Sequence, residues 1–257
     1  MSSALFPAIS DPLFYAAAIP AVVLTGISKA GTGGGVGSLA VPLLTLAVAG
    51  PQAAAIMLPI LIVLDAFGLV AFRKRFDARL LRLTLPAALI GILVGTLLFH
   101  VVDQRLIKAL IGAEAVIFAL AKLREGAAAW TAPPAALSPL RARFWSAIAG
   151  FTSFISHAGG PPMMQLMLPL RLAPALFVGT LTWFFAVVNF VKLAPYAWLG
   201  LIDTTNLATS LMLLPVAPIG YLLGLRLLRW MKPSVFVRVV TWAMLLTGCK
   251  LLYDGLA

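Results

Sequence analysis

Gly26–Gly37 reads GISKAGTGGGVG, and Gly150–Pro162 reads GFTSFISHAGGPP. Each stretch interrupts an apolar run, and the apolar segments on either side are too short to cross a bilayer alone. Paired interruptions rich in glycine and proline, in corresponding halves of a membrane protein, indicate a solute site near the middle of the bilayer. The two breaks therefore favour a binding site inside the membrane over a simple membrane anchor.

The composition of the whole chain indicates an integral membrane protein. Its 257 residues are 62% hydrophobic and 11% charged, whereas soluble domains average about 45–50% apolar and about 25% charged residues. The net charge of +11 fits the positive-inside rule better than nucleic-acid binding, because no basic stretch is interleaved with stacking aromatic residues. The single cysteine, Cys249, excludes an internal disulfide and a cysteine-based metal site. We expect no cofactor, no metal and no nucleic-acid partner.

The apolar residues run continuously rather than alternating, which predicts helices and an all-α integral membrane fold. Six segments are long enough to cross: about 52–72, 83–102, 106–123, 175–199, 206–225 and 235–253. Four shorter segments flank the breaks: 13–28 with 36–49, and 144–156 with 163–170. We predict that each pair folds as a broken helical hairpin, which enters and leaves the membrane on one side.

Charge predicts the orientation. Basic residues gather near 73–82, in the Pro-rich linker around 122–143, at Arg171 and near 226–232. The positive-inside rule places these segments in the cytoplasm. With these segments in the cytoplasm, the predicted membrane crossings leave both termini outside, in the periplasm of a cell with an inner membrane.

The two halves of the chain resemble each other at an offset of roughly 124–129 positions. Gly26 aligns with Gly150, Asp65 with Asn189, and Pro86–Gly95 with Pro215–Gly224. Three full crossings plus a hairpin make an odd number of traverses, so the second half inserts upside down. We therefore predict two inverted-topology repeats, at residues 1–123 and 144–257, joined by a cytoplasmic linker at 124–143.

The breaks have the chemistry of an anion site. A new helix is expected near Val36 and another near Met163, and a helix N-terminus offers free N–H donors and partial positive charge. Glycines let an anion approach the backbone closely. The alternative is that these glycines only permit close packing of helices.

Polar residues inside the membrane are candidates for function, because they are costly there. The predicted substrate-binding residues are Lys29, Gly31, Thr32, Gly33, Gly34, Gly35, Ser38, Ser156, His157, Gly159, Gly160 and Gln165. Candidates for proton or ion coupling are Asp65, Glu114 and Asn189, together with His157. The alternatives are a structural ion pair between Lys29 and a carboxylate, a structural histidine, and hydroxyl groups bonded back to their own helix.

With these residues in view, the chain resembles the sulfite exporter TauE/SafE family of membrane permeases. The resemblance covers nearly the whole length and rests on GISKAGTGGGVGSLAVPLL, on SHAGGPPMMQLMLPL and on the two-half layout. It implies transport, often export, of small sulfur-containing anions such as sulfite, sulfonates or sulfoacetate.

We therefore expect a non-enzymatic carrier of a small sulfur anion that works by alternating access. One alternative is a carrier of the same fold for another small anion or a metal ion. A second alternative is a membrane assembly factor that transports nothing. The oligomeric state, the exact substrate and the coupling ion stay open at this point.

Overall fold

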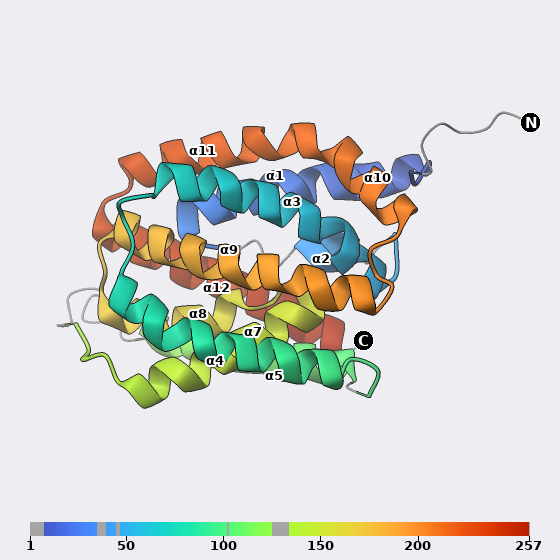
Figure 1. Cartoon of the computed structure of the whole chain (residues 1–257). Helices are drawn as coiled ribbons and strands as arrows, with labels where there is room; N and C mark the ends of the chain where they lie inside the picture. Colours follow the sequence, from blue (N-terminus) through green and yellow to red (C-terminus); the bar gives the residue numbers. More distant parts are fainter. Residues whose placement is uncertain (1–7, 35–39, 45–46, 102, 125–133, 257) are drawn as a thin grey trace, which may run out of the picture.

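Helices make up every regular element in the part of the chain that the computed structural model describes, which comprises residues 8–34, 40–44, 47–101, 103–124 and 134–256 (Figure 1). The first half contains α1 (Pro12–Thr32), α2 (Ala40–Leu44), α3 (Gly50–Ala71), α4 (Ala78–Leu97) and α5 (Gln104–Arg124). The second half contains α7 (Pro139–Ser156), α8 (Gly160–Met167), α9 (Pro174–Trp198), α10 (Thr204–Leu213), α11 (Ala217–Trp230) and α12 (Pro233–Leu256). The predicted all-α fold is confirmed.

Six helical stretches are long and apolar enough to cross a membrane, so the chain is a multi-pass membrane protein. They are Pro12–Thr32, Gly50–Ala71, Ala78–Leu97, Pro174–Trp198, Thr204–Trp230 and Ser234–Leu256. Five of them match predicted spans, whereas the predicted span at 106–123, in α5, is not among them and Pro12–Thr32 takes the sixth place. Large apolar side chains cover the outer faces of these helices, for example Ile90, Leu93 and Leu97 on α4. Such a surface suits contact with lipid, because a soluble protein rarely exposes so large an apolar area.

Two helices begin about five residues earlier than the hydropathy pattern indicates. Asp77 accepts a hydrogen bond from the Leu80 N–H at 2.9 Å and so caps the start of α4. Ser138 caps the start of α7 in the same way, with Pro139 at the first helical position. Capping residues in the polar segments before the apolar runs therefore make both helices start earlier than the apolar runs do.

The expectation of two short arms in each hairpin was wrong for the first arm. α1 has 21 residues and α7 has 18, whereas the returning segments α2 and α8 have 5 and 8. α1 continues past Lys29 as far as Thr32, and the next residue, Gly33, has a φ of +73°. The left-handed conformation at Gly33 then ends the helix.

The two breaks share one backbone geometry. His157 ends α7 with a φ of +54°, at the place where Gly33 ends α1. Beyond each cap the next residue donates a hydrogen bond across six residues: Gly34 N to Ser28 O at 3.0 Å, and Ala158 N to Thr152 O at 3.2 Å. Each of these residues in the first break lies 124 positions before its counterpart in the second break: Gly33 before His157, Gly34 before Ala158, and Ser28 before Thr152.

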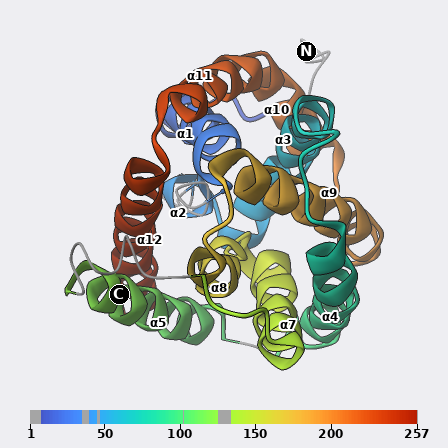
Figure 2. The same ribbon diagram turned by 90° about the vertical axis from the view of Figure 1, so that its left-hand side faces the viewer.

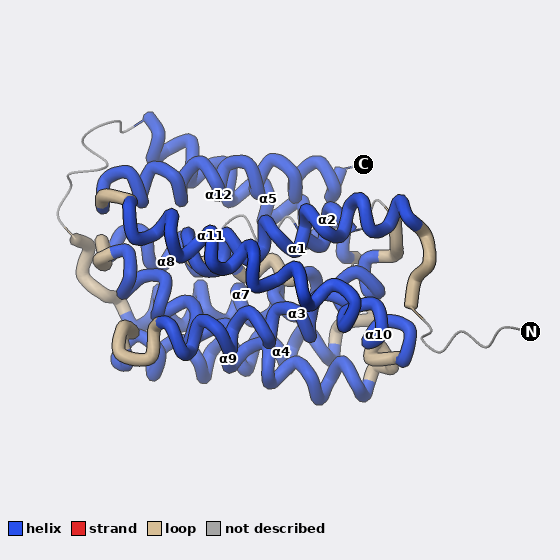
Figure 3. The backbone as a smooth tube through the Cα atoms, turned by 90° about the horizontal axis from the view of Figure 1, so that it is seen from above, coloured by secondary structure: helices blue, strands red, loops and turns tan. Residues whose placement is uncertain are grey.

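The long helices run side by side, and the loops gather at the two ends of the bundle (Figures 1 and 3). The connections from α3 to α4, from α8 to α9 and from α11 to α12 lie at the left-hand end in Figure 1, the end that faces the viewer in Figure 2. The start of α1 and the end of α12 lie at the opposite end. The loops that the charge pattern groups together thus share one end of the molecule.

Helices from opposite halves cross closely through glycines. A Cβ atom on Gly26 of α1 would lie 2.7 Å from the backbone N of Tyr221 in α11. A Cβ atom on Gly150 of α7 would lie 2.0 Å from the backbone O of Ala88 in α4. The two crossings therefore have no room for a side chain, and these two glycines serve the packing of helices.

Candidate functional site

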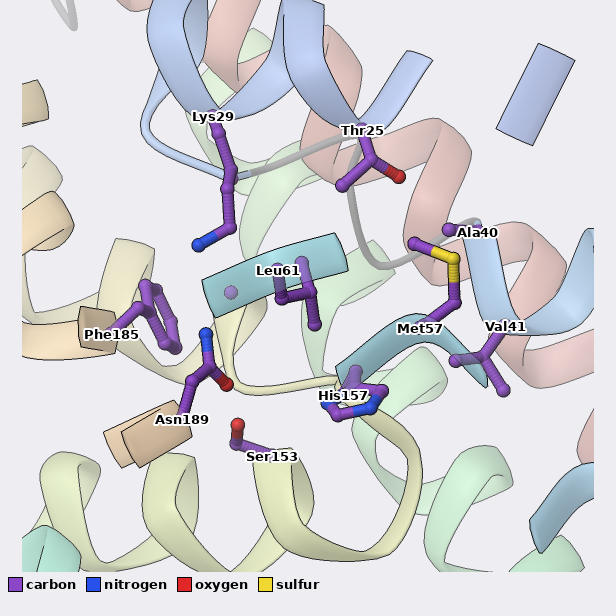
Figure 4. A pocket seen from close by; sticks show the side chains of 12 residues that line it. Thr25, Lys29, Ala40, Val41, Met57, Leu61, Ser153, His157, Phe185 and Asn189 are labelled. Atoms are coloured by element: carbon purple, nitrogen blue, oxygen red, sulfur yellow. The ribbon is translucent and has the colours of Figure 1, made fainter. Parts of the chain in front are cut away.

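A cavity of about 40 Å³ lies inside the bundle, between the two breaks. A single water needs roughly 10–15 Å³ by this measure, so the cavity suits a small solute. Side chains from both halves of the chain point into it, as Figure 4 shows. Its lining residues are Thr25, Lys29, Gly34, Ala40, Val41, Met57, Leu61, Ser153, His157, Gly160, Phe185 and Asn189.

Lys29 and Asp65 form a buried ion pair at the edge of this cavity. The Asn189 side chain donates a hydrogen bond to the other carboxylate oxygen of Asp65 at 2.7 Å. Asp65 and Asn189 align in the predicted repeat, and the structure brings them into direct contact between α3 and α9. In Figure 4 the ammonium of Lys29 and the amide of Asn189 point towards the same space. One carboxylate thus holds one lysine and one amide in place.

A second cation, Lys192 on α9, lies behind the cavity wall and has 0% exposed surface. Its Nζ lies 3.0 Å from the Ser153 backbone O, 3.1 Å from the Ser153 Oγ and 2.7 Å from the His157 Nδ1. Lys192 was not among the predicted site residues. A lysine in the middle of an apolar helix is itself a signal of function, and Lys192 lies three residues after Asn189, on the same face of α9.

His157 connects this lysine to the cavity. Its Nε2 lies 2.9 Å from the Ala54 backbone O, which can only accept, so the ring carries its proton on Nε2. Nδ1 then accepts a hydrogen bond from the Lys192 Nζ. The left-handed backbone at His157 directs the ring away from α7 towards α3, and both ring nitrogens are satisfied.

The surroundings of the cavity contain two lysines and a single carboxylate among the described residues. Asp65 is that carboxylate, and it pairs with Lys29. The other described carboxylates cap helix starts or bond elsewhere: Asp11, Asp77, Asp103, Glu114, Asp203 and Asp254. The excess of positive charge favours an anionic solute.

Five predicted residues meet around the cavity: Lys29, Gly34, His157, Gly160 and Asn189. Asp65 and Gly33 line a smaller space beside them, which also contains Lys29. Gly35 and Ser38, both predicted to bind substrate, lie outside the described residues.

Four predicted residues have structural roles in this conformation. Gly31 packs on α11, since its Cβ would lie 3.2 Å from the Gly224 backbone O. The hydroxyls of Thr32 and Ser156 bond back to carbonyl groups of their own helices. Gly159 lies against α7, where its Cβ would approach the backbone O of Ala149 at 2.8 Å. These contacts support the packing alternative for Gly31 and Gly159, and the alternative of hydroxyl groups bonded back to their own helix for Thr32 and Ser156.

Gln165 and Glu114 lie apart from the central cavity. The Gln165 amide donates a hydrogen bond to the Glu114 carboxylate. The two line an open cleft between α5 and α8, which is otherwise apolar and shares no lining residue with the cavity. They therefore do not face the solute space that Lys29 and His157 line.

The start of α8 offers fewer amides than the sequence suggests. The helix begins at Gly160, close to the break as predicted, but the next two residues are Pro161 and Pro162. Proline has no N–H group, so two of the first three helical positions cannot donate a hydrogen bond. The first residues of the other expected helix, near Val36, lie outside the described residues. Side chains are thus the main cationic groups at the described site.

A comparison with protein families identifies the family of the chain. The sulfite exporter TauE/SafE family model matches residues 18–251, which include both breaks and the whole cavity lining. No curated protein sequence and no solved structure matches the chain.

Proposed function

The chain belongs to the sulfite exporter TauE/SafE family, and we propose that it exports a small sulfur oxyanion or organosulfonate from the cell. Sulfite, sulfonates and sulfoacetate are the candidate substrates. The observation that carries the proposal is the presence of two lysines, the partly buried Lys29 and the fully buried Lys192, beside a cavity with a single buried carboxylate. The anion would occupy the cavity between Lys29, Ser153, His157 and Asn189.

The size and the charge of the cavity both support a small anion. A buried charge is costly unless an opposite charge or hydrogen bonds satisfy it. An oxyanion placed between the two lysines would balance the second positive charge. It would also accept hydrogen bonds from the Asn189 amide and the Ser153 hydroxyl, both of which line the cavity.

Alternating access in this protein would use two inverted repeats. The matched caps at Gly33 and His157, the matched crossings at Gly26 and Gly150, and the contact of Asp65 with Asn189 support this arrangement. A pseudo-twofold axis through the last contact would relate the two breaks, and a solute on that axis could face either side in turn.

The charge pattern supports a location in the inner membrane, with the basic loops in the cytoplasm and both termini in the periplasm. An inside-negative potential of about 100 mV favours the exit of each negative charge by roughly 2.3 kcal/mol. This potential alone would drive the export of a solute that leaves with a net negative charge. Glu114 lines a separate cleft, so it would not carry a proton coupled to the solute in this cavity.

A flux assay tests the proposal. The purified protein is reconstituted into liposomes that are loaded with sulfite, sulfoacetate, methanesulfonate, acetate or a divalent metal chloride. We expect release of the sulfur anions well above the rate of protein-free liposomes, and slower release of acetate and metal. Release of the metal without release of the anions would mean that the substrate is a metal ion and not a sulfur anion. If the protein binds sulfite but releases no solute, a role as an assembly factor would be favoured.

A further inference from the structure

The polar groups around Lys192 suit two protonation states of that lysine. His157 Nδ1 and the Ser153 backbone O can only accept hydrogen bonds from it, whereas the Ser153 Oγ can accept or donate. An ammonium would donate to all three. A neutral amine would donate to the two fixed acceptors and accept from the Ser153 hydroxyl, which needs only to rotate.

No carboxylate among the described residues forms a salt bridge with Lys192, and Asp65, the nearby carboxylate, is already paired with Lys29. Salt bridges among those residues join Lys29 to Asp65 and Lys250 to Asp254, and neither contains Lys192. The only Asp or Glu outside the described residues is Glu125, which follows the end of α5 in the linker. A buried ammonium without a counterion is unfavourable, so it gains stability from an anion nearby or from the loss of its proton.

The neighbouring ionisable groups leave Lys192 as the group that can change charge. Those that lie near it on α1, α3, α7 and its own helix are Lys29, Asp65, His157 and Tyr196. Lys29 and Asp65 hold each other's charge in an ion pair, the Tyr196 hydroxyl donates to the Phe154 O, and the Ala54 carbonyl fixes the His157 proton. α4, which also packs on α9, contributes only Arg79 and Arg82, and both are exposed.

We propose that Lys192 takes up a proton when the anion enters the cavity, so that anion and proton bind together. In the empty protein the side chain is a neutral amine, and the Ser153 hydroxyl donates to it. When the anion binds, the amine gains one proton from solution and becomes an ammonium, and no other bond is made or broken. This inference rests on the proposed function, because it assigns a coupled proton to the same site.

Calorimetric titration of the purified protein with sulfoacetate in two buffers of different ionisation enthalpy measures the protons taken up. Sulfoacetate is the probe because its own charge is constant in the neutral and mildly alkaline range. We expect wild type to take up about one proton per anion there. Lys192→Arg, which is always charged, should bind the anion with no proton uptake. Lys192→Met should bind it about ten- to hundredfold more weakly, also without uptake.

The controls separate this proposal from the proposed function. Lys232→Met removes an exposed lysine at the start of α12 and should behave as wild type in both readouts. Binding by wild type without proton uptake, or wild-type uptake by Lys192→Arg, would overturn the role of Lys192 and leave the carrier intact. If folded wild type binds neither sulfoacetate nor sulfite, the proposed function fails and this inference fails with it.

Discussion

At the scale of single residues, the site contains charges that depend on one another. Lys29 cannot be removed without leaving the Asp65 carboxylate unpaired inside the bundle. A loss of transport in a Lys29 variant would therefore mix a binding effect with a folding effect. The binding effect and the folding effect can be separated if the charge of Asp65 is removed as well. Asn is the neutral replacement, because Asn189 occupies the position that aligns with Asp65.

Lys29→Ala should destabilise the protein by about 3–5 kcal/mol, since breaking a buried pair leaves an uncompensated charge. It should also weaken anion binding. The double variant Lys29→Ala with Asp65→Asn should recover most of the stability but not the binding. Thermal unfolding in detergent and sulfite titration measure the two effects. Full binding by the double variant would remove Lys29 from the site.

Gly34→Val tests the first break. Gly34 has a φ of +100°, and a Cβ there would meet only the Phe185 ring, at 3.9 Å. The cost of about 1–3 kcal/mol therefore comes from the backbone conformation rather than from crowding. Because Gly34 lines the cavity, we expect flux in liposomes to fall as well.

The matched control for that variant is Gly200→Val. Gly200 has a φ of +69° with open space around it, in the loop between α9 and α10. The Gly200→Val variant should lose about as much stability as Gly34→Val and should keep the wild-type flux per folded molecule. Equal flux in both variants would mean that Gly34 serves only the backbone turn that follows α1.

At the scale of helices, sequence and structure agree where the signal is local. Five of the six predicted spans, the two breaks and the caps at Asp77 and Ser138 can be recognised from short stretches of sequence. The exceptions are α5, which was predicted to span, and α1, which was predicted to be too short. Lys192 could not be placed beside His157 in the same way, because 35 residues and the packing of α9 on α7 separate them. The α8 amides were overestimated although Pro161 and Pro162 are plain in the sequence.

Gly26→Leu and Gly150→Leu should each destabilise the protein by about 1–3 kcal/mol or prevent its folding, because a side chain meets backbone of the opposite helix. Yield and thermal unfolding in detergent measure this effect. Ala16→Leu, at an exposed position of α1, is the control and should change little. If Gly26→Leu is as stable as wild type, the close crossing of α1 and α11 is not required.

At the scale of the whole molecule, the charge pattern assigns the two ends of the bundle to the two faces of the membrane. Lys74 is exposed in the loop between α3 and α4, and Ile202 is exposed in the loop between α9 and α10. The two loops lie at opposite ends (Figure 1). Their accessibility from outside the cell therefore tests the orientation without any assumption about substrate.

In a Cys249→Ser background, a membrane-impermeant maleimide should label Ile202→Cys in intact cells. It should label Lys74→Cys only after the membrane is permeabilised, because the basic loops should be cytoplasmic. The unmodified Cys249→Ser protein is the control for background labelling. Labelling of Lys74→Cys alone in intact cells would reverse the topology and place both termini in the cytoplasm.

The glycine crossings restrict which parts of the protein can swing during a transport cycle. α1 packs closely on α11, and α4 packs closely on α7, so each contact joins the first half of the chain to the second. A hinge motion of one half against the other would separate the helices at both contacts. If the protein works by alternating access, we expect the moving bodies to be mixed pairs of helices from both halves. In the liposome flux assay, a chemical cross-link from α1 to α11 should then leave turnover intact, whereas one from α1 to α7 across the cavity should stop it.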